Sequence, residues 1–164
     1  MNNISIVFIG LDTHKEFFEV AHELDGRDNH VTHDGRISSS KSSVIKMARD
    51  FQSKYPQATL HFVYEAGPCG YWIYRLLTSL GHCCYVVASS LLPKKPGEKV
   101  KTDRKDAMKL AHLLKMNDIP IIYVPEAEDE AVRDLSRPRQ TATNDLNHAR
   151  SQVLNYCKYH YRAR

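Results

Sequence analysis

Short apolar runs alternate with amphipathic segments along the first 115 residues of the chain. Five runs rich in β-branched and aromatic residues predict β-strands. The first run, Ile4–Ile9, ends on Gly10-Leu11-Asp12, and the others span Glu16–Leu24, Asn29–Ser38, Thr59–Tyr64 and His82–Ala88. Apolar residues at helical spacing predict three helices, whose stripes run over residues 44–55, 73–80 and 107–114. This order predicts an α/β fold, in which crossover units extend a three-stranded antiparallel run into a mixed sheet with helices on its faces.

Capping and turn residues mark where these elements begin and end. Ser39-Ser40 offers an N-cap to the first helix, Thr102 offers one to the third, and Gly81 suits the end of the second. Asp34-Gly35 is a turn signal inside the third strand, so we expect a bulge there. The segment Leu91–Lys101, with two prolines and a glycine, predicts a basic loop.

The pattern changes after Pro125, which is the approximate domain boundary. Steps of three and four form a heptad-like seam, which consists of Val132, Leu135, Arg139, Ala142, Leu146, Ala149, Val153 and Tyr156. Pro138 should kink or break this helix, and Arg139 takes a core position. We predict an α/β domain over 1–125 and, over 126–164, a coiled-coil-like arm that pairs two or more copies of the chain. The alternative is a helix packed back on its own domain.

Composition and charge narrow the class of protein. The 164 residues, 42% apolar and 26% charged, suit one soluble α/β domain with an appendage. No apolar run approaches the roughly 20 residues of a membrane helix, and the four cysteines have neither C-x-x-C nor disulfide-framework spacing, so we expect a cytoplasmic protein with reduced thiols. The segment from Val132 to Arg164 is basic within a chain of net charge +4, which modestly favours nucleic acid as a partner.

Four carboxylates stand where their elements begin or end. Asp12 ends the first strand, Glu65 ends the fourth, and Asp103 and Asp106 share one face at the start of the third helix. If the first and fourth strands are neighbours, the four acids meet at one edge of the sheet. The plain alternatives are a turn residue for Asp12 and solvated first-turn acids, favoured by the helix dipole, for the pair on the helix.

Converging acids repel one another, and a cation relieves that repulsion. Oxygen ligands suit Mg²⁺ or Mn²⁺, and two such ions about 3.5–4 Å apart can clamp the attacking and leaving oxygens of a phosphodiester displacement. Basic residues near the acids in the sequence are candidates for holding a phosphate backbone: Lys15, Lys94, Lys95, Lys99, Lys101, Arg104 and Lys105. His14, beside Asp12, fits a phosphate contact and an ordinary turn residue equally well, and the histidines and cysteines lack the spacing of a zinc site.

Three blocks of the sequence resemble the DEDD transposases, bacterial insertion-sequence enzymes related to the Piv invertase. The blocks are GLDTHK at 10–15, YEAGPCG at 64–70 and KTDRKDAMKLAHLL at 101–114. The resemblance covers roughly Ile4–Lys115 and continues weakly into the arm. The third block is the most specific, because it matches two acids and the helix stripe behind them. By this resemblance, the family's catalytic and metal-binding tetrad falls on Asp12, Glu65, Asp103 and Asp106.

The resemblance implies a ribonuclease H-like fold similar to the RuvC Holliday-junction resolvase. It also implies divalent-metal binding, DNA strand cleavage and exchange during transposition, and in some relatives a structured guide RNA. Family members continue into a second domain with a nucleophilic serine. That domain is absent from this sequence, so we expect an amino-terminal domain or a truncated remnant.

Three other functions compete with this one. The first is a catalytically inert module for dimerisation and nucleic-acid binding, and the second is an autonomous junction resolvase. The third is a nucleotide-binding domain of the actin and sugar-kinase type, which needs a glycine where this chain has His14. That mismatch disfavours the third function.

Overall fold

The computed structural model describes residues 5–26, 30–67, 69–88, 90, 92 and 102–161. The chain divides into two compact units, residues 1–123 and residues 124–164. Apart from Leu92, the predicted basic loop at 91–101 lies outside the described residues. Among the helices that are described, none combines the length and the apolar character needed to cross a membrane.

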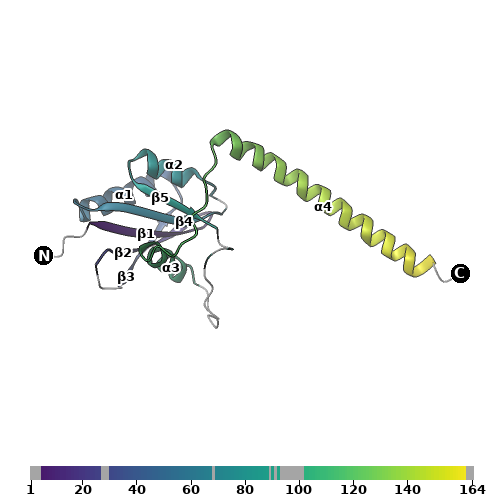
Figure 1. Ribbon diagram of the computed structural model, residues 1–164, viewed down its shortest axis with the longest axis horizontal. Coiled ribbons are helices and arrows are strands. Elements are labelled where there is room, and N and C mark those ends of the chain that lie inside the picture. The colour runs from purple at the N-terminus through teal and green to yellow at the C-terminus, as the bar shows by residue number, and fades with distance from the viewer. Residues whose placement is uncertain are drawn as a thin grey trace. The chain divides into compact units, whose positions relative to one another are not determined.

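Unit 1 is built on a five-stranded mixed sheet (Figure 1). Its strands are β1 (Ile6–Thr13), β2 (Phe17–Leu24), β3 (Val31–Ser38), β4 (Thr59–Glu65) and β5 (Cys83–Val87). The spatial order is β3-β2-β1-β4-β5, in which β1 to β3 pair antiparallel and β4 and β5 extend the sheet in parallel from β1. This mixed sheet confirms the predicted α/β fold class.

Two details of the first three strands follow from their pairing. The first strand was predicted to end on Gly10-Leu11-Asp12, and β1 ends one residue later, at Thr13, where its ladder with β2 closes on the pair Thr13↔Phe18. Asp12 therefore lies within a strand rather than in the turn after it. The predicted bulge in β3 is confirmed, since the register shifts opposite Asp34 and Gly35 has a φ of 108°.

Helices cover both faces of the sheet (Figure 1). The helices α1 (Lys41–Lys54) and α2 (Trp72–Ser79) lie on one face, and α3 (Asp103–Lys115) lies on the other. Side chains alternate between the faces along each strand. In β2, Phe18 packs against Trp72 of α2, whereas Glu23 bonds to residues of α3.

The predicted helix ends are confirmed in two cases and corrected in a third. The Ser40 side chain accepts a hydrogen bond from the Ser43 amide at 3.2 Å and caps α1. Gly81 follows α2 with a φ of 85°, a conformation that glycine adopts without strain. Thr102 is the N-cap residue of α3, but its side chain makes no capping hydrogen bond.

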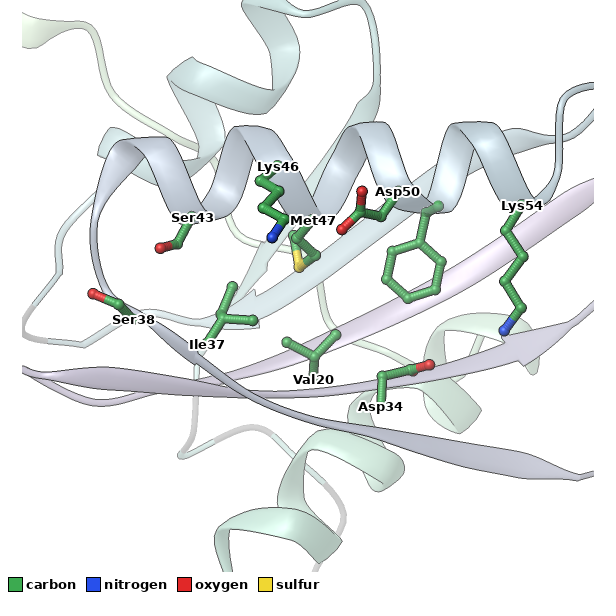
Figure 2. Close-up of a pocket in the computed structure, with 10 residues that line it drawn as sticks. Val20, Asp34, Ile37, Ser38, Ser43, Lys46, Met47, Asp50 and Lys54 are labelled. Atoms are coloured by element: carbon green, nitrogen blue, oxygen red, sulfur yellow. The ribbon is translucent and has the colours of Figure 1, made fainter.

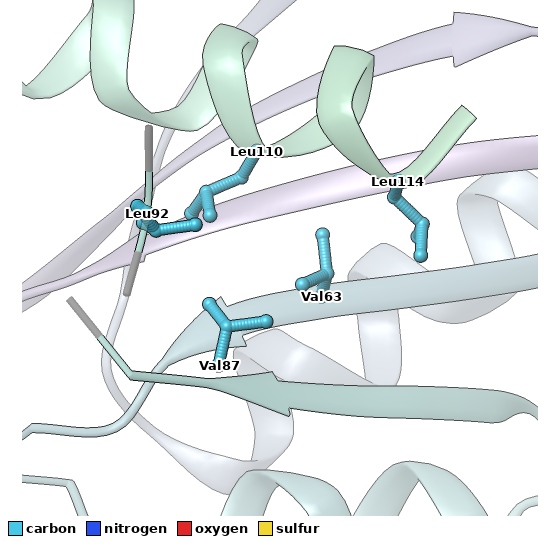
Figure 3. Close-up of a cluster of buried hydrophobic side chains, with 5 residues drawn as sticks. All are labelled: Val63, Val87, Leu92, Leu110 and Leu114. Atoms are coloured by element: carbon cyan, nitrogen blue, oxygen red, sulfur yellow. The ribbon is translucent and has the colours of Figure 1, made fainter. Parts of the chain in front are cut away.

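An apolar cluster joins α3 to the parallel half of the sheet (Figure 3). Its buried members are Val63, Val87, Leu92, Leu110 and Leu114. Leu110 and Leu114 stand one turn apart on α3, so a single stripe of the helix meets β4 and β5. The predicted apolar stripe of this helix is confirmed, since its four residues are all buried: Ala107, Leu110, Ala111 and Leu114.

The described part of unit 2, residues 124–161, contains one regular element. This is α4 (Ala127–Tyr161), a helix of 35 residues. It runs without interruption through Pro138, so the break predicted as one possibility there does not occur. A single helix has no second element within its own unit against which its apolar seam can pack.

Candidate metal centre

Asp12 reaches one end of the sheet from its central strand. In the parallel ladder of β1 and β4, Gly10 pairs with Val63 and Leu11 with Tyr64. Continuing this register by one residue sets Asp12 beside Glu65, the last residue of β4. Because Gly10, Asp12 and Glu65 are separated by even steps along the ladder, both acids lie on the face of the sheet that α3 covers.

The close approach of α3 to β1 depends on Gly10. A Cβ atom on Gly10 would lie 2.2 Å from the Ala107 carbonyl oxygen and 2.6 Å from the Ala111 nitrogen. The helix backbone thus rests directly on the strand, where only glycine leaves room. Asp103 and Asp106 occupy the first turn of this helix, ahead of Ala107 and Ala111 in the sequence, and are close to Asp12 at the end of β1.

His14 lies between two of the acids. Its Nε2 is 3.1 Å from Asp12 Oδ2 and 3.4 Å from Asp103 Oδ2. Potential ligand atoms of these three residues all lie within 4.8 Å of one another. Among the described residues, Asp12, His14 and Asp103 thus form a group able to hold a cation, and Glu65 and Asp106 are not members of it.

Burial and neighbouring acids raise the pKa of Asp12. Burial raises the pKa of Asp12, the charge of His14 and its hydrogen bond lower it, and the charges of Asp106 and Asp103 raise it; the net pKa lies above the ordinary value. Asp106 is therefore close enough to repel Asp12, although it stands outside the three-residue group. A cation among these carboxylates would remove both the desolvation cost and the repulsion, so the donor set fits a divalent ion.

Glu19 is a further acid at this site that the sequence reasoning did not single out. It pairs directly across from Asp12 in the β1–β2 ladder. Burial opposes its ionisation, but hydrogen bonds from His33 (2.8 Å) and Arg36 (2.8 Å, through Nε) outweigh that effect and lower the pKa of Glu19. Its charge is thus compensated within the protein, whereas the charge of Asp12 faces other acids.

Three of the predicted phosphate-binding residues fall within the described chain. Lys15, Arg104 and Lys105 are exposed, next in sequence to His14 or to the acids of α3. The others, Lys94, Lys95, Lys99 and Lys101, lie outside the described residues. The described basic side chains thus flank the acidic group in the sequence and are open to solvent.

His14 is the residue of this site whose role the sequence did not decide. Its spacing from Asp12 was the available signal, because residues two apart in an extended chain point to the same side. The ring of His14 also packs against Phe17, with 4.7 Å between ring centroids. Neither the contact with Phe17 nor that with Asp103 can be read from the sequence.

A cavity of about 380 Å³ lies on the opposite face of the sheet, between α1 and the strands β2 and β3 (Figure 2). Val20 and Ile37 line it from the strands, and Lys46, Met47 and Asp50 line it from α1. None of the four predicted acids lines it. The cavity is therefore separate from the candidate metal centre.

The chain is similar to known transposases. The chain is 40% identical over 155 residues to y4qE of Sinorhizobium fredii, named as a transposase, an alignment that covers 94% of this chain and 39% of that protein. It is 34% identical over 151 residues to the transposase for insertion sequence element IS1533 of Leptospira borgpetersenii, covering 92% of this chain and 43% of that one. The chain thus spans less than half the length of the curated relatives that it matches.

A solved structure, the large terminase nuclease from the thermophilic phage G20c, aligns with 69% of this chain and 56% of that one, with a TM-score of 0.41 and 14% identity. Residues 9–159 match a family of DEDD transposases of the IS110 type, described as "Transposase". That match takes in the end of β1 with Asp12 and the whole of α3 with its two acids, as well as most of α4. The protein therefore belongs to the DEDD transposase family of the IS110 type.

Proposed function

We propose that this chain is the metal-dependent DNA-cleaving part of an insertion-sequence transposase. In this proposal Asp12, Glu65, Asp103 and Asp106 hold Mg²⁺ or Mn²⁺ and act on a DNA phosphodiester. The observation that carries it is the meeting of Asp12 and Asp103 around His14, with Asp106 close enough to raise the pKa of Asp12. Three acids from two distant segments converge at one end of the sheet, as a cation site requires.

Each residue has a distinct part in this proposal. When bound, divalent ions supply charge stabilisation for the oxygens of a phosphoryl displacement. Asp12 is the central ligand because burial and neighbouring acids give it the most to gain from a cation. Glu65, on the neighbouring strand, and Asp106, on α3, complete the oxygen set from either side. Complete strand exchange is proposed for the longer protein, with metal binding and strand cleavage assigned to this part.

DNA is the proposed partner of the exposed basic residues. Lys15, Arg104 and Lys105 neighbour the acids in the sequence and would contact the backbone phosphates on either side of the reacting one. A structured guide RNA would offer the same phosphate chemistry. Binding of either nucleic acid should weaken steeply as salt rises, since phosphate contacts release counterions.

We expect Asp12→Asn to abolish stabilisation of the chain by divalent metal. A ligand at one hundred times its dissociation constant stabilises the folded state by about 2.7 kcal/mol, so the wild-type chain should melt several degrees higher in excess Mn²⁺. The variant should show no metal-dependent gain. Without metal it should melt no lower than the wild type, because the amide carries no charge to be desolvated beside Asp103 and Asp106. Melting curves with and without Mn²⁺ measure both effects.

Asp118→Asn is the matched control, since Asp118 is exposed and follows the opposite end of α3. It should respond to Mn²⁺ as the wild type does. An equal response from Asp12→Asn and the wild type would support the rival function, an inert module for dimerisation and nucleic-acid binding.

We further propose that α4 pairs two copies of the chain. Its seam presents Leu135, Leu146 and Val153, and no element of its own unit covers them. Most helical stability in proteins comes from tertiary packing of an apolar face, so the uncovered seam of this 35-residue helix favours a partner. Leu135→Asp together with Leu146→Asp should convert a dimer to a monomer in analytical ultracentrifugation.

Asn144→Asp adds a charge to the opposite side of the same helix and should leave the dimer intact. A monomer for the wild-type chain, or a dimer that survives both seam substitutions, would contradict the pairing. Neither result would bear on the metal centre, because Asp12→Asn tests that site separately.

A further inference from the structure

We propose that His14 is a metal ligand, and that through its imidazole nitrogen the centre binds Mn²⁺ in preference to Mg²⁺. This inference rests on the proposed function, since it concerns the same cation site. The four acids alone would supply only oxygen ligands, and His14 adds one nitrogen ligand to them. The nitrogen is Nε2, the atom that lies between Asp12 and Asp103.

The distances around Nε2 match those between neighbouring ligands of one small cation. With bonds of about 2.1 Å, adjacent ligand atoms stand about 3.0 Å apart in an octahedron and about 3.4 Å apart in a tetrahedron. Nε2 lies 3.1 Å from Asp12 Oδ2 and 3.4 Å from Asp103 Oδ2. Nε2 is therefore at coordination spacing from both carboxylate oxygens, and the potential ligand atoms of the three residues all lie within 4.8 Å of one another.

The ring of His14 is held in place by groups outside the acidic cluster. The His14 amide donates to the Phe17 carbonyl at 2.9 Å, which closes the turn between β1 and β2. The ring then packs against the Phe17 ring, which in turn carries the Arg36 guanidinium 3.7 Å from its centroid. Phe17 thus orients the imidazole before any ion arrives, as preorganised ligand sites require.

The donor type decides which cation benefits. Mg²⁺ binds oxygen ligands and keeps much of its water. Mn²⁺ also favours carboxylate oxygen, but as a first-row transition ion it accepts an imidazole nitrogen more readily than Mg²⁺ does. A set with one nitrogen and two carboxylate oxygens therefore favours Mn²⁺ through His14, while the carboxylates serve both ions. His14 is 38% exposed, so an ion can reach Nε2 from solvent without unfolding of the sheet.

Mn²⁺ bound to the full chain provides a direct test. In the wild type, pulsed electron paramagnetic resonance should detect ¹⁴N coupling from a directly bound imidazole. His14→Ala should lose that coupling and weaken Mn²⁺ binding by about ten-fold or more, while Mg²⁺ affinity changes by less than about three-fold. Calorimetric titration with each ion separately supplies the affinities. His30→Ala is the matched control, because His30 is an exposed histidine directly before the start of β3.

The possible results separate the role of His14 from the site as a whole. Tighter binding of both ions by His14→Ala would mean that the imidazole competes with the cation. Unchanged binding would mean that the imidazole does not contact the ion. Either result overturns the assignment of His14 as a ligand and leaves the carboxylate site in place. A wild-type chain that binds neither ion would overturn both proposals. Circular dichroism without metal verifies that the variant folds.

Discussion

Gly10→Ala should lower the free energy of unfolding of unit 1 by about 3 kcal/mol, at the upper end of the range for overpacked cores. The added methyl group would overlap the Ala107 carbonyl oxygen at 2.2 Å and the Ala111 nitrogen at 2.6 Å. Both are backbone atoms, so no change of rotamer relieves the overlap. The helix α3 must move away from β1, and Asp103 must move with it. We therefore also expect the Mn²⁺-dependent stabilisation to fall or vanish.

Urea unfolding followed by the fluorescence of Trp72, the chain's single tryptophan, measures this effect within unit 1. Gly67→Ala is the matched control, because the nearest heavy atom to its new Cβ is the Glu65 oxygen at 3.8 Å, an ordinary contact. That variant should lie within about 1 kcal/mol of the wild type. Equal stability for the two variants would mean that α3 does not rest on Gly10.

Glu23→Gln should cost about 3 kcal/mol, because it breaks a buried ion pair on one side only. Glu23 is fully buried, and its two oxygens bind Lys115 Nζ at 2.8 Å and His112 Nδ1 at 2.9 Å. Lys115 is only 11% exposed, so its ammonium would lose a charged partner where little water can replace it. The same Trp72 unfolding measurement applies.

A double variant separates the loss of the ion pair from the effect of each substitution on packing. Glu23→Gln combined with Lys115→Met removes both charges, and it should be more stable than the sum of the two single changes predicts. Glu16→Gln is the control, since Glu16 is an exposed acid just before the same strand, and it should change stability by no more than about 0.5 kcal/mol. Strict additivity of the two single changes would contradict the coupling.

These two contacts fix α3 at different points along its length. Gly10 allows the middle of the helix to touch β1, and Glu23 binds its last turns to β2. With the helix held at both points, its first turn projects over the end of β1. The candidate metal centre thus depends on packing contacts that contain none of its ligands.

Much of this arrangement was predicted from local patterns. The apolar first strand, the stripe on α3 and the turn signal at Gly35 each depend on residues close together in the sequence, so spacing was enough to predict them. The acids were identified by their positions at the ends of elements and by the resemblance of three sequence blocks. The end of β1 was predicted to within one residue, and its last pair with β2 is set by the hairpin partner and not by apolar residues alone.

The sequence by itself determined the α/β class, the order of the elements and the acids available for a metal. Only the tertiary structure decided which groups meet: His14 between Asp12 and Asp103, and Glu19 opposite Asp12 but neutralised by Arg36. The reason is that these contacts join segments up to 89 positions apart in the numbering, from Asp103 back to His14. The contact with Asp103 further depends on the fit of the α3 backbone onto Gly10, which no local pattern specifies.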